Sequence, residues 1–223
     1  RLTDSGLGCP DWPGCYGSAS PVGARAEIAA AQEAMPTGPV THGKAWVEMI
    51  HRYLATGVGV LIIVLTVSSW VQQRRARQGR AEAPPLSPLW PTVTLVWVCL
   101  QGAFGALTVT MKLFPAIVTL HLIGGLVLLA LLCVQAARHT HAAQGRSPTQ
   151  ISPALRQGLA WTGLLLALQV VLGGWVSTNY AVLACTTFPT CQGSWWPAMD
   201  FAQGFQIWRK LGMLQDGSHI SFA

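Results

Sequence analysis

Residues 53–71 read YLATGVGVLIIVLTVSSWV and lie between Arg52 and Arg74 with no charged side chain among them. A helix needs about 20 apolar residues to cross the hydrocarbon core of a bilayer, so this stretch is long enough to span one. A segment in lipid must satisfy its own backbone hydrogen bonds, which favours a helix over an isolated strand. Three more uncharged stretches follow, between Glu82 and Lys112, between Lys112 and Arg138, and from Gly158 to Thr178.

These stretches predict an all-α membrane protein, a transmembrane helix bundle with four spans at roughly 48–71, 90–110, 115–136 and 158–178. The composition agrees, because 51% of the 223 residues are hydrophobic and 10% are charged, against roughly 25% charged in a soluble domain. The net charge of +6 would suit either nucleic acid or a membrane surface. Because the charges lie outside the apolar stretches, a lipid bilayer is the expected partner and nucleic acid is not.

Basic residues in two connections predict the direction of the spans. Residues 72–89 hold four arginines and residues 137–157 hold three. By the positive-inside rule both connections face the cytoplasm. The cysteine-bearing segments 1–47 and 179–223 then lie on the outer side, as suits a multi-pass protein of a bacterial plasma (inner) membrane. An apolar periodicity over 200–215 predicts a short helix lying at the membrane surface.

A pattern recurs in the two outer segments. Residues 9–17 read CPDWPGCYG and residues 185–193 read CTTFPTCQG, with cysteines, an aromatic residue, a proline and a glycine at matching places. A weaker echo, Leu-Gln followed by Gly, pairs residues 100–105 with residues 168–173. Duplication is the simplest cause. Because a span directly precedes the second copy, we expect one before the first copy, and this chain to be a fragment of an eight-span duplicated bundle.

The predicted organisation follows from the spans and the repeat. It comprises an outer loop (1–47), three spans of an N-terminal four-helix half (48–136), an inner linker (137–157), and the first span and outer loop of a C-terminal half (158–223).

Glu48 and His51 lie three residues apart near the outer end of the first span, so they occupy neighbouring positions on one helix face. A charged side chain at the centre of a span costs about 2.5–3.5 kcal/mol on insertion scales, which makes an ionisable residue there a functional candidate. The structural alternative is that Glu48 lies in the headgroup region and pairs with Arg52.

His121 lies about six residues into the third span, among apolar neighbours. Because the first and third spans run in the same direction, His51 and His121 enter from the same side and reach a similar depth. Two neutral imidazoles facing each other across a helix bundle are the arrangement that axial ligation of a haem iron requires. The alternative is that each histidine is a hydrogen-bonded packing residue.

The outer cysteines form two closely spaced pairs, Cys9 with Cys15 and Cys185 with Cys191. On an oxidising outer face each pair can close a small ring. Each is either a structural disulfide or a redox-active pair that exchanges with a thiol carrier.

Four motifs together resemble the haem A synthase family across essentially the whole chain. They are the outer Cys-x5-Cys with Trp12-Pro13, the Glu48-x-x-His51-Arg52 sequence, the Thr119-Leu-His121 span and the duplicated Cys-x5-Cys. The resemblance implies eight spans in two four-helix halves, of which this chain supplies the second to fifth. It also implies a haem-dependent oxidoreductase for cytochrome oxidase assembly, which converts haem O to haem A by oxidising a ring methyl to a formyl group through successive hydroxylations.

The same resemblance implies roles for individual residues. His51 and His121 would be axial ligands of the haem iron and Glu48 the catalytic carboxylate. The cysteine pairs would be disulfides, the first taking part in electron transfer. Haem O would be the substrate and haem b a cofactor, held by second-half ligands outside these residues. Expected partners are haem O, the enzyme that makes it, and a quinone or thiol electron carrier.

Two other functions fit part of the pattern. A quinone-linked membrane disulfide oxidoreductase would use both outer cysteine pairs but leaves His51 and His121 without a role. A haem-binding electron carrier would use both histidines but gives Glu48 no task.

Overall fold

The computed structural model describes residues 6–36, 38–80, 87–145, 149–179, 181 and 184–208. This part of the chain is helical, with isolated two-residue bridges and no strands. The helices are α1 (Arg25–Ala34), α2 (His42–Arg77), α3 (Leu89–Thr110), α4 (Pro115–Ala143), α5 (Pro153–Thr178) and α6 (Phe201–Gly204).

Helices α2 to α5 are long and apolar enough to cross a membrane. They contain the predicted spans in order, so the prediction of an all-α membrane bundle with four spans is confirmed. Helix α2 has 36 residues, which gives a length of about 54 Å. A hydrocarbon core is only about 30 Å thick, so the ends of α2 extend beyond its apolar stretch.

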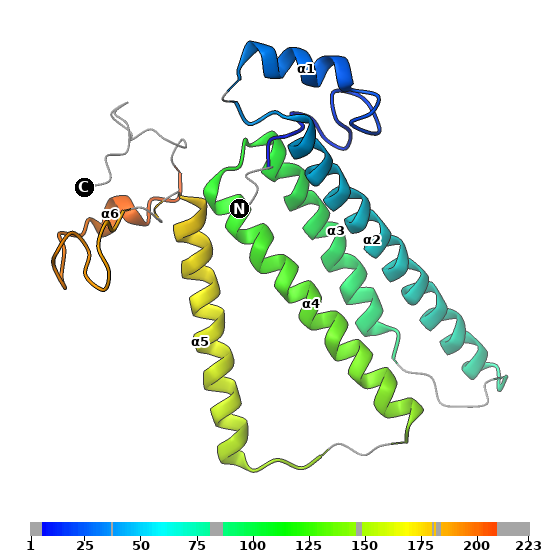
Figure 1. Cartoon of the computed structure of the whole chain (residues 1–223). Helices are drawn as coiled ribbons and strands as arrows, with labels where there is room; N and C mark the ends of the chain where they lie inside the picture. Colours follow the sequence, from blue (N-terminus) through cyan, green and yellow to red (C-terminus); the bar gives the residue numbers. More distant parts are fainter. Residues whose placement is uncertain are drawn as a thin grey trace.

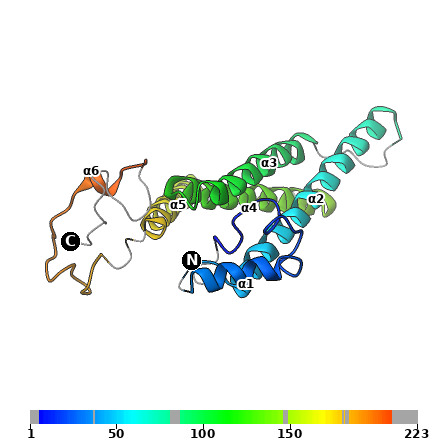
Figure 2. The same cartoon turned by 90° about the horizontal axis from the view of Figure 1, so that it is seen from above.

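The four spans stand in an open row, each packed on the next in chain order. Helix α2 packs on α3, α3 on α4, and α4 on α5. No packing contact joins α2 to α4 or α5 within the described ranges. Figure 1 shows α1 and α6 at the same end of the spans, which we call the cysteine end, and Figure 2 shows the row from above with α6 beyond α5.

Polar side chains pair between neighbouring spans. Gln135 of α4 donates a hydrogen bond from Nε2 to Oγ1 of Thr94 on α3, and both residues are buried. The hydroxyls of Thr119 on α4 and Thr178 on α5 lie 3.0 Å apart, also buried. A buried polar group without a partner is unfavourable, so these pairs favour one rotation of each helix against its neighbour.

The sequence predicts one helix over 200–215, but the structure has only the short helix α6 there. The prediction is wrong for the described residues that follow α6. Helix α6 begins after Asp200, whose side chain accepts a hydrogen bond from the Gln203 amide, and it ends at Gly204. Residues 205–208 are not helical, and 209–215 lie outside the described residues. A tertiary contact replaces the continuing helix, because the Trp175 indole donates to the Gly204 carbonyl at 2.8 Å.

Two adjacent glycines of α5 provide a test of the α4–α5 packing. A Cβ on Gly174 would lie 3.1 Å from a Leu122 methyl carbon, whereas a Cβ on Gly173 would meet nothing within 4 Å. We expect Gly174→Leu to destabilise the protein by about 1–3 kcal/mol through overpacking, measured by thermal unfolding in detergent. Gly173→Leu is the matched control, and equal losses in the two variants would contradict this packing.

Candidate functional site

The first cysteine loop packs against the beginning of α2. Cys9 and Cys15 are joined by a disulfide and are both fully buried. The Sγ atom of Cys9 lies 3.9 Å from the Ala45 carbonyl oxygen. A Cβ on Gly8 would lie only 2.6 Å from the Lys44 carbonyl carbon, so the loop can approach the helix backbone this closely only with glycine there.

The loop is also fixed internally by Asp11. Its carboxylate accepts hydrogen bonds from the backbone amides of Tyr16, at 2.6 Å, and Gly17, at 2.7 Å. Tyr16 has a positive φ of 50°, a backbone conformation that residues other than glycine rarely adopt. The hydrogen bonds to the Asp11 carboxylate stabilise the turn in this conformation. Burial and, after it, the charge of Asp11 raise the pKa of the Tyr16 phenol.

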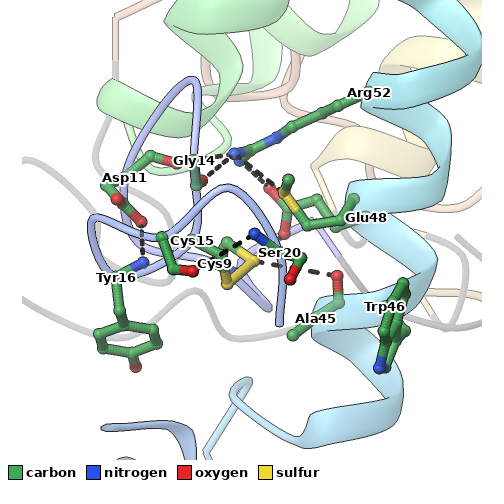
Figure 3. The surroundings of a disulfide bond; sticks show 12 residues. Cys9, Asp11, Gly14, Cys15, Tyr16, Ser20, Ala45, Trp46, Glu48 and Arg52 are labelled. Atoms are coloured by element: carbon green, nitrogen blue, oxygen red, sulfur yellow. Dashed lines mark hydrogen bonds and ion pairs between the residues drawn. A yellow bond between two sulfur atoms is a disulfide. The ribbon is translucent and has the colours of Figure 1, made fainter. Parts of the chain in front are cut away.

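Arg52 links this loop to the helix (Figure 3). Its Nη1 donates to the backbone carbonyls of Asp11, at 2.9 Å, Pro13, at 3.1 Å, and Gly14. Its Nη2 forms an ion pair with Glu48 one turn earlier on α2. One guanidinium therefore binds three loop carbonyls and one carboxylate, a use of its fixed donors that a lysine could not reproduce.

Glu48 lies between the loop and the helix. Its Oε2 accepts a hydrogen bond from the Cys9 backbone amide at 3.0 Å, and its Oε1 pairs with Arg52. The Glu48 side chain is 9% exposed and that of Arg52 12%. The pairing considered for Glu48 from sequence is thus present, but it belongs to a larger network that holds the carboxylate beside the disulfide.

The two candidate histidines come from different spans. His51 is exposed on α2 and His121 is half-buried in the second turn of α4, and both lie toward the cysteine end of the spans (Figure 1). Helix α3 packs on both of their helices and so lies between them in the row. The two helices therefore provide two imidazoles on separate spans, with no hydrogen bond between them in the described part of the chain.

Gln101 of α3 is a polar neighbour of His121 that sequence reasoning did not pair with it. Its Nε2 lies 3.0 Å from His121 Nδ1 and donates to the His121 carbonyl oxygen at 2.5 Å. The sequence draws attention to Gln101 only through the repeated Leu-Gln pair, which does not indicate that His121 is its partner.

The second cysteine loop repeats the geometry of the first. Cys191 and Ser194 form the same backbone bridge as Cys15 and Ser18. Thr187 binds the Gly193 amide at 3.1 Å, as Asp11 binds the equivalent glycine. Cys185 and Cys191 form a disulfide that is more exposed than the first pair, and in the described residues no span packs beneath this loop. The structure therefore brings the first loop to Glu48 and leaves the second apart from it.

Comparison with known proteins places these features in a family. The family model described as cytochrome oxidase assembly protein matches residues 1–220. The chain belongs to this family. A Heme A synthase of Shewanella oneidensis is 38% identical over 222 residues, covering all of this chain. Two others, from Halalkalibacterium halodurans and Symbiobacterium thermophilum, are 26% and 28% identical over 94% of it.

The family relationship concerns a part of these relatives. The chain spans 62% of the length of each of the three. No solved structure matches the chain. Family membership confirms the resemblance inferred from the four motifs.

The contacts of Arg52 predict that the loop loosens when this side chain loses its charge. Arg52→Gln would leave the carboxylate of Glu48 and the loop carbonyls without their donor, at about 1–3 kcal/mol for each buried group left unpaired. We expect dithiothreitol to reduce the Cys9–Cys15 disulfide several-fold faster in this variant, as followed by mass analysis after thiol alkylation. Arg25→Gln, an exposed position on α1, is the control. Unchanged reduction in Arg52→Gln would contradict the role of Arg52.

Proposed function

We propose that this chain is the substrate-binding part of a haem A synthase, which oxidises a ring methyl of haem O to a formyl group. The observation that carries the proposal is that Glu48 and His51 lie three residues apart on α2 and His121 lies in the second turn of α4, all toward the cysteine end of the spans (Figure 1). Relatives named Heme A synthase support the reaction class.

The donor set is suited to a haem iron. Two imidazoles from separate spans are what axial ligation uses. Within the described ranges no three His, Cys, Asp or Glu side chains gather around one point, as a metal bound by protein ligands alone would need. The His121 ring is also closely accommodated, because a Cβ on Gly105 would lie 3.3 Å from its Cε1.

In this proposal the two histidines would hold haem O as the substrate, and the two electrons of each oxidation of the methyl carbon would pass through its iron to the quinone or thiol electron carrier. Glu48 accepts a proton as the methyl carbon is hydroxylated, and its negative charge stabilises positive charge that develops on that carbon. Arg52 and the Cys9 amide fix the carboxylate by one bond to each oxygen. The Cys9–Cys15 loop covers the end of α2 and limits the access of water to Glu48.

The two disulfides support different roles. The first pair is fully buried, which favours a structural disulfide that holds the loop on Glu48. The second pair is more exposed and is the better placed for exchange with a thiol electron carrier. A quinone is the other carrier class we propose, and haem b is the proposed resident cofactor.

The proposed setting is the plasma (inner) membrane, with the cysteine end on the outer side. Helix α2 ends in Arg74, Arg75 and Arg77 at the opposite end, and Arg138 lies 5.5 Å from the Trp90 ring there. Arginines at this end support a cytoplasmic location for it. We further propose that 48–136 belong to an N-terminal four-helix half and 158–223 to a C-terminal half, joined by the linker 137–157 and preceded by the outer loop 1–47.

Glu48→Gln tests the proposed chemistry. The amide keeps the shape of the side chain but accepts no proton, so we expect haem binding to persist and haem A formation to fall by about 100-fold or more. The measurement is pigment extraction with mass analysis, after expression of the whole gene in cells supplied with haem O. Glu33→Gln, exposed on α1, is the control. Haem A at the control level in Glu48→Gln would refute the catalytic role of Glu48. Bound haem with no haem A in any of the proteins would support the electron-carrier alternative instead.

The histidines are tested by their effect on haem retention. We expect His51→Ala and His121→Ala each to remove the low-spin absorption of one haem, because each removes one axial nitrogen. His139→Ala, exposed near the opposite end of α4, should leave the spectrum unchanged. A protein that keeps all its low-spin haem in both variants would refute the proposed ligand pair.

A further inference from the structure

We propose that Gln101 is a positioning residue for His121, which sets the orientation of the imidazole ring and leaves Nε2 as the nitrogen that binds iron. The inference rests on the proposed function, because it assigns a partner to one of its two ligands. It concerns a residue of α3 that lies between the two histidine-bearing helices.

Gln101 contacts both the imidazole ring and the backbone carbonyl of His121. Its side-chain nitrogen is 3.0 Å from His121 Nδ1 and 2.5 Å from the His121 carbonyl oxygen. Fixing both points prevents the ring from turning independently of α4. Among the described residues no other side chain has a hydrogen bond to the His121 ring.

The surrounding helix faces are shaped for this contact. A Cβ on Gly124 would lie only 2.1 Å from Gln101 Oε1, so the amide can occupy its place only beside glycine. Trp97, one turn before Gln101 on α3, donates from its indole to the Gly124 carbonyl at 2.9 Å. One turn after Gln101 comes Gly105, where a Cβ would lie 3.3 Å from His121 Cε1. Three successive turns of α3 therefore present Trp97, Gln101 and Gly105 to the same stretch of α4.

An amide is the side chain that suits both protonation patterns of the ring. With Nδ1 unprotonated, the Gln101 N–H donates to it. A histidine that binds iron through Nε2 carries its proton on Nδ1. Gln101 then accepts from that N–H only by presenting its amide oxygen there, which exchanges its bond to the His121 carbonyl for the bond to the ring. In either state Nδ1 is engaged and Nε2 faces away from Gln101. A neutral amide does this without adding a charge to the span.

The chain offers a matched control for the packing role of such a residue. Gln135 is also a glutamine between α3 and α4, it is 3% exposed, and its Nε2 bonds to Thr94. It lies about four turns from His121 along α4, so it shares the structural role of Gln101 and lacks contact with the ring.

The experiment compares variants of the whole gene product, purified with its haem in detergent. The variants are Gln101→Met, Gln101→Glu, Gly124→Ala and Gln135→Met, with His121→Ala to define the spectral signal that belongs to this ligand. Electron paramagnetic resonance and visible absorption report the spin state of the ferric haem, redox titration its midpoint potential, and thermal unfolding the integrity of the fold.

We expect Gln101→Met to convert part of the His121-dependent low-spin signal to high spin and to weaken haem retention by about 10–100-fold. Gly124→Ala should have the same effect, because the added methyl group would push the Gln101 amide away from His121 although residue 101 is still glutamine. Gln101→Glu should keep the low-spin signal and lower the midpoint potential, since a carboxylate accepting from Nδ1–H makes the imidazole a stronger donor. Gln135→Met should reduce stability without changing the spectrum.

Two results would overturn the proposal, and they are distinguishable. If the His121-dependent signal is present and Gln101→Met changes it no more than Gln135→Met does, Gln101 is a packing residue only. If no low-spin signal depends on His121 in the unmodified protein, the proposed ligand set fails, and the role of Gln101 fails with it.

Discussion

Hydrocarbon offers no hydrogen-bond partner to a polar group, and this constraint governs both the packing and the site. Each polar side chain buried between spans must find its partner in the protein. The pairs Gln135 with Thr94, Gln101 with His121 and Thr119 with Thr178 provide such partners, and the Gln135 Oε1 atom alone is buried without one among the described side chains. Because apolar contacts alone discriminate little between rotations of a helix in lipid, these pairs select which face of α4 meets α3 and which meets α5.

The same constraint explains why the one acidic side chain of the four spans lies where it does. Glu48 is in the second turn of α2, where the helix extends beyond its apolar stretch and the first cysteine loop covers it. Arg52 balances its charge and at the same time binds three loop carbonyls. Removing the loop would therefore expose the carboxylate to water, and removing the carboxylate would leave Arg52 and the Cys9 amide without a partner. The loop and the candidate catalytic group depend on each other.

The spans could be predicted because their signal is one-dimensional: an uncharged stretch long enough to cross a bilayer must form a helix whatever surrounds it. The cysteine repeat could be recognised for a similar reason, since its turn is fixed by local residues such as Asp11 and Gly17. The partner of Gln101 could not be predicted, because it depends on how α3 rotates against α4. The helix expected beyond Gly204 failed for the same kind of reason. Apolar spacing favoured it, but a contact with Trp175, distant in sequence, is formed instead.

The charged groups of the candidate site and its uncharged groups lie at different depths along the spans. At the cysteine end, where α2 leaves its apolar stretch, the site has a carboxylate, a guanidinium and backbone amides, which are groups able to move or stabilise charge. Further along the spans it has imidazoles, an amide and glycines, which include no carboxylate or guanidinium and are therefore better tolerated in lipid. A flat apolar substrate entering from the bilayer would meet the neutral groups over most of its surface and the charged ones at one edge only. Under the proposed function, such a division would favour oxidation of a single ring substituent, because the charged groups lie at one end of the site only.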